Sequence, residues 1–254
     1  MAEVDEYSLC AIPIELFFND TCLGIGTGFV WVLDKKHFLV TNWHNLSGIN
    51  PATGKHLSDK AAEPNKFKVH YNTKGKLGAR TAKTMMIRSP ENAPLWFVHP
   101  DKGKSVDIGA LEINLDSDVD PWAINERPSE LLRTQIGMDV FVLGYPFGIS
   151  ADGFPVWKRG SIASEPGIAF EKGTSFFVDT ASRPGMSGSP VIRRSWGTHV
   201  LENGSTVMGP GSKTRLVGIY SGRLSSGDPL DAQLGIVWPA HLIDDVIKGR
   251  KVDS

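Results

Sequence analysis

Cysteine is scarce in this chain, which has only two, Cys10 and Cys22, among its 254 residues. They lie close together near the N-terminus without a CxxC pair, so we expect free thiols, with a single bridge between facing strands as the alternative. A chain of this length can stabilise a core without disulfides, which favours a reducing compartment. We therefore expect a cytoplasmic protein.

The sequence also lacks an excess of charge of either sign, because 27 Lys and Arg residues face 28 Asp and Glu residues for a net charge of -1. Nucleic acids and anionic membranes attract basic surfaces, so neither is expected as a partner. Long apolar runs are missing as well. The first 18 residues open with acids and contain Pro13 and Glu15, so we expect neither a signal peptide nor a membrane span there.

Metal-binding patterns are equally scarce. No two of the seven histidines have the HExxH spacing or a comparable ligand spacing. A metal-dependent hydrolase therefore has little support, and we expect no metal and no cofactor.

Short apolar runs separated by turn residues are abundant. Such runs occupy residues 9–18, 27–33 and 106–113, and the chain contains 27 Gly and 16 Pro. This pattern predicts an all-β protein, and all-β double barrels reach this length as one unit. We expect no nucleotide site in GIGTG, since no helical pattern and no GK[ST] follow it.

The acidic, proline-containing stretch 119–136 divides the chain into two β-rich parts of a single domain, 7–118 and 137–240. In the second part we expect the polar, glycine-containing residues 196–212 to form a loop. Residues 241–249 predict a C-terminal amphipathic helix. Its apolar face consists of Leu242, Ile243, Val246 and Ile247.

Residues 180–190, TASRPGMSGSP, form a turn of small residues that presents Ser187. Such a turn can hold a serine hydroxyl at a fixed angle, with the backbone N–H groups of Gly185 and Ser187 directed into one space. An oxyanion hole is built in this way, because its donors must already point at the developing charge. The alternative is a plain loop between two strands.

A serine hydroxyl needs a base and an orienting carboxylate before it becomes a nucleophile. The run at residues 37–46 ends in a polar turn that carries His44, and Asp107 stands near the head of the run 106–113. Either residue alone is more typical of a satisfied core histidine or a solvated strand end. Together with Ser187 they give the order His, Asp, Ser, which is the chymotrypsin-like order.

The sequence resembles the trypsin-like serine proteases of the chymotrypsin fold, and within them the HtrA/Deg catalytic domains. TNWHNL resembles the family's TNxHV segment, DIGALEI resembles DxALLKI, and VDTASRPGMSGSPVI resembles TDAxxxPGNSGGP. GTGFVW, VFVLGYPFG and LVGIYSG are supporting matches. The resemblance implies two packed six-stranded β-barrels with a short C-terminal helix. It also implies catalytic roles for His44, Asp107 and Ser187, and oxyanion donors at Gly185 and Ser187.

The resemblance also indicates where the specificity pocket lies. Its base falls on Ala181, beside Ser182, so the acidic floor that selects Lys or Arg is missing. Ser221, Gly222 and Arg223 would form the strand that pairs with the substrate backbone. A small or medium apolar residue before the scissile bond is the preference this implies.

Two positions depart from the family pattern. Met186 stands where Asp or Asn is usual, and Ser189 replaces a usual Gly. We expect no PDZ-like domain after the C-terminal helix. The leading hypothesis is a serine endopeptidase acting on proteins or peptides through an acyl-enzyme. The alternative is a latent or catalytically silent module that acts by binding or needs an activating partner; a homo-oligomer also stays open.

Overall fold

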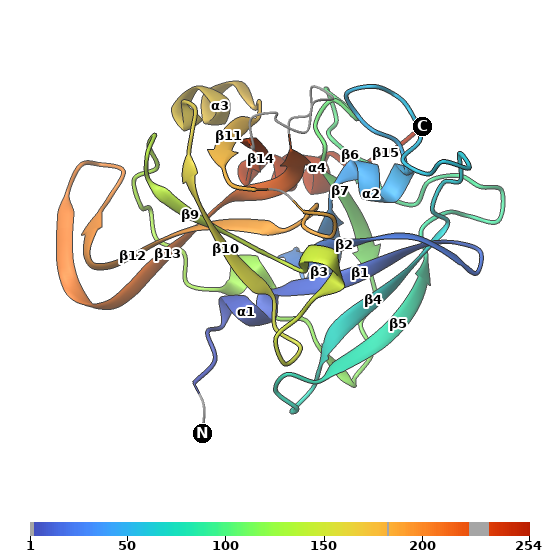
Figure 1. Cartoon of the computed structure of the whole chain (residues 1–254), viewed down its shortest axis with the longest axis horizontal. Coiled ribbons are helices and arrows are strands. Elements are labelled where there is room, and N and C mark those ends of the chain that lie inside the picture. The colour runs from blue at the N-terminus through green and yellow to red at the C-terminus, as the bar shows by residue number, and fades with distance from the viewer. Residues whose placement is uncertain (1–2, 182, 224–233) are drawn as a thin grey trace.

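The computed structural model describes residues 3–181, 183–223 and 234–254. Its strands form two sheets, and a short helix, α4 (His241–Gly249), follows the last long strand (Figure 1). The all-β class and the C-terminal helix are confirmed. The boundaries 7–118, 119–136 and 137–240 stay predictions.

The first sheet contains nine strands in the order β15-β6-β7-β3-β2-β1-β4-β5, with β8 beside β4. Three of these strands are only two residues long, so six longer strands make up most of the sheet. The sequence predicted a six-stranded barrel for this part of the chain. Their buried faces enclose a core of Ile, Leu, Val and Phe side chains. The bounds are β1 (Ala11–Phe18), β2 (Thr21–Leu33), β3 (Lys36–Thr41), β4 (Lys66–Thr73), β5 (Arg80–Met86), β6 (Phe97–Val98), β7 (Gly109–Ile113), β8 (Val119–Asp120) and β15 (Lys251–Val252).

The second sheet closes into a barrel of six strands in the order β10-β11-β14-β13-β12-β9. Closure pairs every strand on both sides, so the barrel has no free edge along its wall. Its interior is a separate apolar core that includes Val142, Val191 and Met186. The bounds are β9 (Asp139–Gly144), β10 (Val156–Ile162), β11 (Phe176–Asp179), β12 (Pro190–Val200), β13 (Thr206–Arg223) and β14 (Leu234–Pro239).

A third apolar core joins the two sheets. It combines Phe29 of β2 with Leu143 and Ile192 of the barrel, and α4 packs into it through the four apolar residues expected from the sequence. The remaining helices are short: α1 (Tyr7–Cys10), α2 (Trp43–Ser47), α3 (Pro166–Lys172), and the 3-10 turns η1 (Ile124–Glu126) and η2 (Pro146–Gly148). The two sheets therefore pack against each other over a buried apolar surface.

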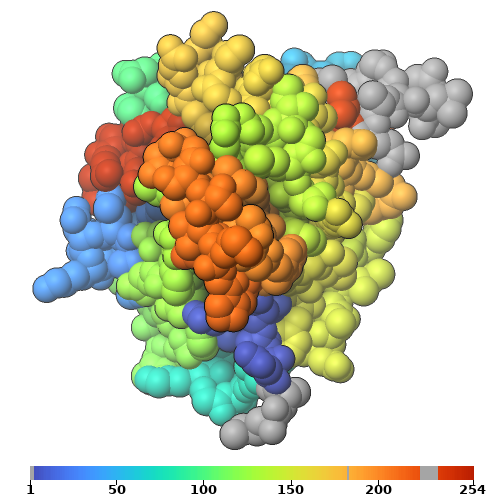
Figure 2. Space-filling view, turned by 90° about the vertical axis from the view of Figure 1, so that its left-hand side faces the viewer, coloured from blue at the N-terminus to red at the C-terminus, as the bar shows by residue number. Residues whose placement is uncertain are grey.

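The prediction of a loop at residues 196–212 is wrong. β12 and β13 continue through most of it as a long hairpin that projects from the barrel, with Ser195 opposite Lys213 and Thr198 opposite Met208 (Figure 1, Figure 2). Beyond the barrel these strands bury neither face consistently, and Trp196 and Met208 are 59% and 79% exposed. The apolar alternation that marks a half-buried strand is therefore missing from the sequence.

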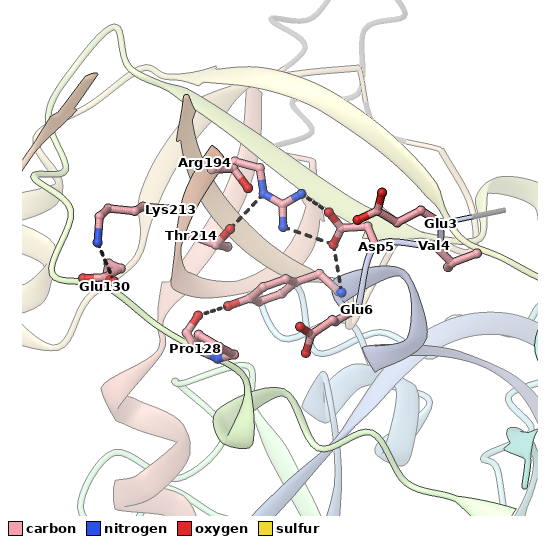
Figure 3. Close-up of a pocket in the computed structure, with 11 residues that line it drawn as sticks. Glu3, Val4, Asp5, Glu6, Pro128, Glu130, Arg194, Lys213 and Thr214 are labelled. Atoms are coloured by element: carbon pink, nitrogen blue, oxygen red, sulfur yellow. Dashed lines mark hydrogen bonds and ion pairs between the residues drawn. The ribbon is translucent and has the colours of Figure 1, made fainter. Parts of the chain in front are cut away.

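The N-terminal residues dock on the C-terminal barrel. Arg194 of β12 forms an ion pair with Asp5 and donates to Thr214 Oγ1 at 2.8 Å (Figure 3). Its guanidinium lies 5.3 Å from the Tyr7 ring and 4.6 Å from the Trp157 ring. This cluster borders a polar cavity of about 470 Å³. One buried arginine thus holds the start of the chain against the other sheet.

Both cysteines are free thiols, as the sequence predicted, with Cys10 buried and Cys22 exposed. Burial raises the pKa of the Cys10 thiol to about 12, so this group is protonated at neutral pH. No helix in the described ranges has the length and hydropathy needed to cross a membrane.

Candidate active site

His44 and Asp107 come together because two paired strands end at the same place. β3 and β7 are antiparallel neighbours with Thr41 opposite Gly109, so the residues after β3 meet those before β7. The sequence placed His44 in a polar turn; it lies instead in α2, which begins two residues after β3 ends. The His44 Nδ1 to Asp107 Oδ2 distance is 2.7 Å.

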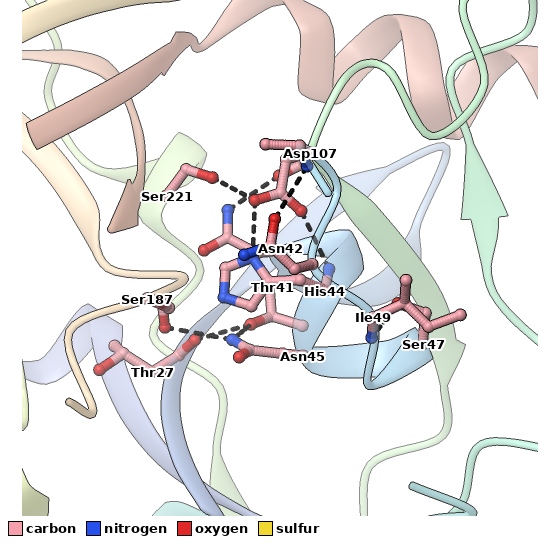
Figure 4. Close-up of polar contacts among 12 residues, drawn as sticks. Thr27, Thr41, Asn42, His44, Asn45, Ser47, Ile49, Asp107, Ser187 and Ser221 are labelled. Atoms are coloured by element: carbon pink, nitrogen blue, oxygen red, sulfur yellow. Dashed lines mark hydrogen bonds and ion pairs between the residues drawn. The ribbon is translucent and has the colours of Figure 1, made fainter. Parts of the chain in front are cut away.

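The Asp107 carboxylate is almost fully buried and is well supplied with donors. The His44 backbone N–H donates to Oδ1 at 2.9 Å, and the Ser221 hydroxyl of β13 donates to Oδ2 (Figure 4). These bonds offset the cost of removing the carboxylate from water. A carboxylate on Nδ1 favours the tautomer that carries its proton there, which leaves Nε2 as the acceptor facing away from Asp107.

Glycines set the shape of the turn that carries Ser187. Gly185 and Gly188 have φ values of +93° and +87°, in the left-handed region. A Cβ on Gly185 would lie 2.2 Å from Tyr145 O, and one on Gly188 would lie 1.9 Å from Thr27 O. Both positions therefore exclude larger residues by conformation and by space. Met186 between them is buried in the barrel core, 1% exposed.

A group of buried polar residues from β2, β3 and α2 holds this turn. The Thr27 N–H donates to Ser187 O at 2.8 Å, and the Thr27 hydroxyl donates to Gly185 O at 2.7 Å. Asn45 Nδ2 donates to Ser187 O at 3.2 Å and to Thr41 Oγ1 at 2.9 Å. The backbone on both sides of Met186 is thus fixed by β2, β3 and α2.

The helix that carries His44 is anchored from its opposite side. Asp253 Oδ2 accepts the indole N–H of Trp43 at 2.7 Å and that of Trp96 at 3.1 Å. Trp43 immediately precedes His44 and is 3% exposed. The C-terminal residues therefore help to orient the first turn of α2.

His44, Gly185 and Ser187 line one cavity of about 500 Å³. Within the described part of the chain, no hydrogen bond joins the His44 ring to the Ser187 hydroxyl, and the N–H groups of Gly185 and Ser187 donate to no residue. Such bonds commonly tighten only when substrate is present. Gly185 and Ser187 thus each carry an unpaired backbone N–H at this cavity, and an oxyanion hole needs such free donors.

The residues expected to bind substrate differ in their distance from Ser187 and in their exposure. Ser221 contacts Asp107, and a Cβ on Gly222 would lie 3.5 Å from Ser187 Oγ, so β13 passes beside the serine. Arg223 is exposed at the end of β13, and Ala181 is half-buried. Ser182 lies outside the described residues.

Sequence reasoning missed four contributors to this site. They are Thr27, Asn45 and Asp253, which position the segments that carry His44 and Ser187, and the bond from Ser221 to the carboxylate, since Ser221 was expected to face substrate. Asn45 follows the candidate base directly, and Thr27 lies in the GTGFVW match. Their partners in the turn, Gly185 and Ser187, are however more than 100 residues away, and nothing local reveals them.

The family model described as the trypsin-like peptidase domain matches residues 26–198, about two thirds of the chain, and this range includes His44, Asp107 and Ser187. The chain belongs to the trypsin-like peptidase family. No curated protein matches the sequence of this chain.

Solved structures with the same fold belong to serine proteases. The serine endoprotease from Yersinia pestis is 16% identical, with a TM-score of 0.51, and the alignment covers 98% of this chain and 67% of that one. The active form of the Rv3671c protease from M. tuberculosis is 18% identical, with a TM-score of 0.50 over 98% of this chain and 83% of that one. Deg5 is also similar, at 18% identity and a TM-score of 0.47 over 95% and 87% of the two chains. At these identities the likeness to the Yersinia pestis and M. tuberculosis proteases concerns the fold, and the chymotrypsin-like fold expected from the sequence is confirmed.

Proposed function

We propose that this trypsin-like peptidase is a serine endopeptidase that cleaves proteins or peptides through an acyl-enzyme. The observation that carries the proposal is the 2.7 Å contact between His44 Nδ1 and Asp107 Oδ2, with Ser187 in the cavity that His44 lines. Cytoplasmic localisation and an activating partner or homo-oligomer stay predictions.

In the proposed first step, the Ser187 hydroxyl attacks the substrate carbonyl carbon while His44 Nε2 takes its proton. Asp107 keeps the imidazole in the right tautomer and stabilises it when it becomes positively charged. The carbonyl oxygen becomes an oxyanion, and the N–H groups of Gly185 and Ser187 are available to bind it.

In the second step, His44 gives its proton to the leaving amine, so that the peptide bond breaks and the acyl group stays on Ser187. Water then attacks the acyl-enzyme with His44 again as base. The product acid leaves, and the serine recovers its proton.

A fluorophosphonate probe tests this assignment. The wild-type protein should be labelled, and Ser187→Ala should not be. Ser189→Ala is the matched control, because Ser189 belongs to the same turn but its buried hydroxyl has no partner among the described residues. Its labelling should match that of the wild type.

Peptide hydrolysis gives a second measure. Ser187→Ala should lower kcat by a factor of about 10⁴ or more, and Asp107→Asn by about 10⁴ through the wrong imidazole tautomer. Absence of labelling in the folded wild-type protein would contradict an active enzyme and favour a latent module.

A further inference from the structure

An apolar cavity opens directly beside Ser187. It has a volume of about 500 Å³, which is within the range of ligand pockets. The described residues that line it include no Asp, Glu, Lys or Arg. Its apolar walls come from the β1–β2 hairpin and from the segment after α2, namely Leu16, Leu23, Ile25, Leu57, Ala62 and Pro64.

The wall formed by residues 48–64 is tied down at several points. The Leu57 N–H donates to Gly48 O at 2.8 Å, and Arg88 Nη2 donates to Glu63 Oε2 at 2.8 Å. A Cβ on Gly48 would lie 2.6 Å from Pro64, so the two ends of the segment are in close contact. Leu57 lines the cavity and is 54% exposed, so part of its side chain faces solvent at the cavity's edge. The wall is therefore present before any ligand binds.

The position of the cavity relative to the catalytic groups shows which part of a substrate would reach it. His44 and Asn45 line it, whereas Ser221, Gly222 and Arg223 of β13 do not. In the proposed mechanism the leaving amine takes its proton from His44, so the chain that follows the scissile bond departs on the His44 side. The acyl part of the substrate lies toward β13. The cavity is therefore on the leaving-group side.

We propose that this cavity binds the side chains of the first two residues after the scissile bond and selects apolar ones of leucine size, with Leu57 as a specificity-determining residue. The inference rests on the proposed function, since the orientation of the substrate comes from the mechanism. Burial of an apolar side chain against these walls is favourable. A carboxylate or ammonium group would lose water there without gaining a partner from the described lining.

The test uses internally quenched peptides that share one sequence before the scissile bond and carry Leu-Leu, Ala-Ala, Asp-Asp or Lys-Lys after it. We expect kcat/KM for Leu-Leu to exceed that for Ala-Ala by about tenfold and that for either charged pair by more, in line with the discrimination of apolar pockets. Equal kcat/KM values for Leu-Leu and Asp-Asp would overturn the inference.

Leu57→Lys supplies the matching variant. It adds a positive charge at a half-exposed position without disturbing a core, so the protein should fold. The ratio of kcat/KM for Leu-Leu over Asp-Asp should fall at least tenfold. Leu131→Lys is the control, since Leu131 is 67% exposed and is not part of the cavity lining. If both variants change the ratio equally, Leu57 does not determine specificity.

Two further measurements separate this inference from the proposed function. A methyl ester has only methanol on the leaving-group side, so its hydrolysis reports the catalytic groups without this cavity, and the wild type and Leu131→Lys should hydrolyse it equally. Binding of the same peptides to Ser187→Ala, followed by fluorescence polarisation, needs no catalysis. Failure of fluorophosphonate labelling would contradict the proposed function, whereas equal affinity for Leu-Leu and Asp-Asp peptides would contradict the cavity's selectivity.

Discussion

Thr27 is a buried residue whose hydroxyl and backbone connect both sheets at the turn that carries Ser187. Its hydroxyl donates to Gly185 O and accepts the Tyr145 N–H at 3.3 Å, while its carbonyl accepts the Thr41 hydroxyl at 2.8 Å. Few side chains can donate and accept at once in so small a space, and a threonine hydroxyl does both. The orientation of the Gly185 peptide therefore depends on one hydroxyl group outside the turn.

Thr27→Val should weaken this arrangement, because valine has the same shape but no hydroxyl. The Gly185 carbonyl and the Tyr145 N–H would lose their partner, which costs about 1–3 kcal/mol of unfolding free energy. A looser turn should also lower kcat/KM by about tenfold or more.

Urea unfolding and peptide hydrolysis measure the two effects. Thr27→Ser keeps the hydroxyl and should retain most of the activity. A valine variant as active as the wild type would show that Thr27 does not position the turn.

At the scale of elements, the turn between β11 and β12 combines left-handed backbone with close contact to β2. Alanine in the left-handed region costs about 1–2 kcal/mol through its Cβ alone. At Gly188 the Cβ would also meet Thr27 O at 1.9 Å, so the turn would have to move away from β2. A second glycine with a left-handed backbone but no close contact separates the cost of the conformation from the cost of the contact.

Gly188→Ala and Gly197→Ala form that pair. Gly197 has φ +69°, and a Cβ there would meet no atom within 4 Å. Gly197→Ala should therefore lose only about 1–2 kcal/mol of unfolding free energy and keep full fluorophosphonate labelling. Gly188→Ala should lose more and label poorly. Similar losses in both variants would mean that the contact with Thr27 is unimportant.

The same elements show which features could be predicted from the sequence and which could not. Asp107 and Ser187 could be located because each lies in a short motif beside a recognisable strand. The extension of β12 and β13 past the barrel could not, because strands that bury neither face carry no alternating pattern. The bonds from Thr27 and Asn45 to the turn also could not be predicted, since they depend on how two sheets dock.

At the scale of the whole molecule, Arg194 fixes the N-terminal segment to the barrel. Its side chain is 8% exposed and is compensated by Asp5, Thr214 and two aromatic rings. A buried cation is stable only while such partners remain. The segment before β1 is therefore part of the folded unit.

Arg194→Met should lower the unfolding free energy by about 2–3 kcal/mol, since it removes the ion pair and the cation–π contacts but keeps an apolar stem. Asp5→Asn should cost less, about 1 kcal/mol, because Asp5 is 38% exposed and its charge is screened by water. Urea denaturation of both variants and of the double variant checks this. Additive losses would show that the two residues do not interact.

The turn that presents Ser187 joins two strands of the barrel, while the groups that hold the carbonyl oxygens of Gly185 and Ser187 come from β2 and α2. Assembly of His44, Asp107 and Ser187 therefore requires the two sheets to dock, beyond the hydrogen bonds that each sheet makes within itself. We expect peptidase activity to return only after the two sheets have docked, so its recovery would report this stage of refolding.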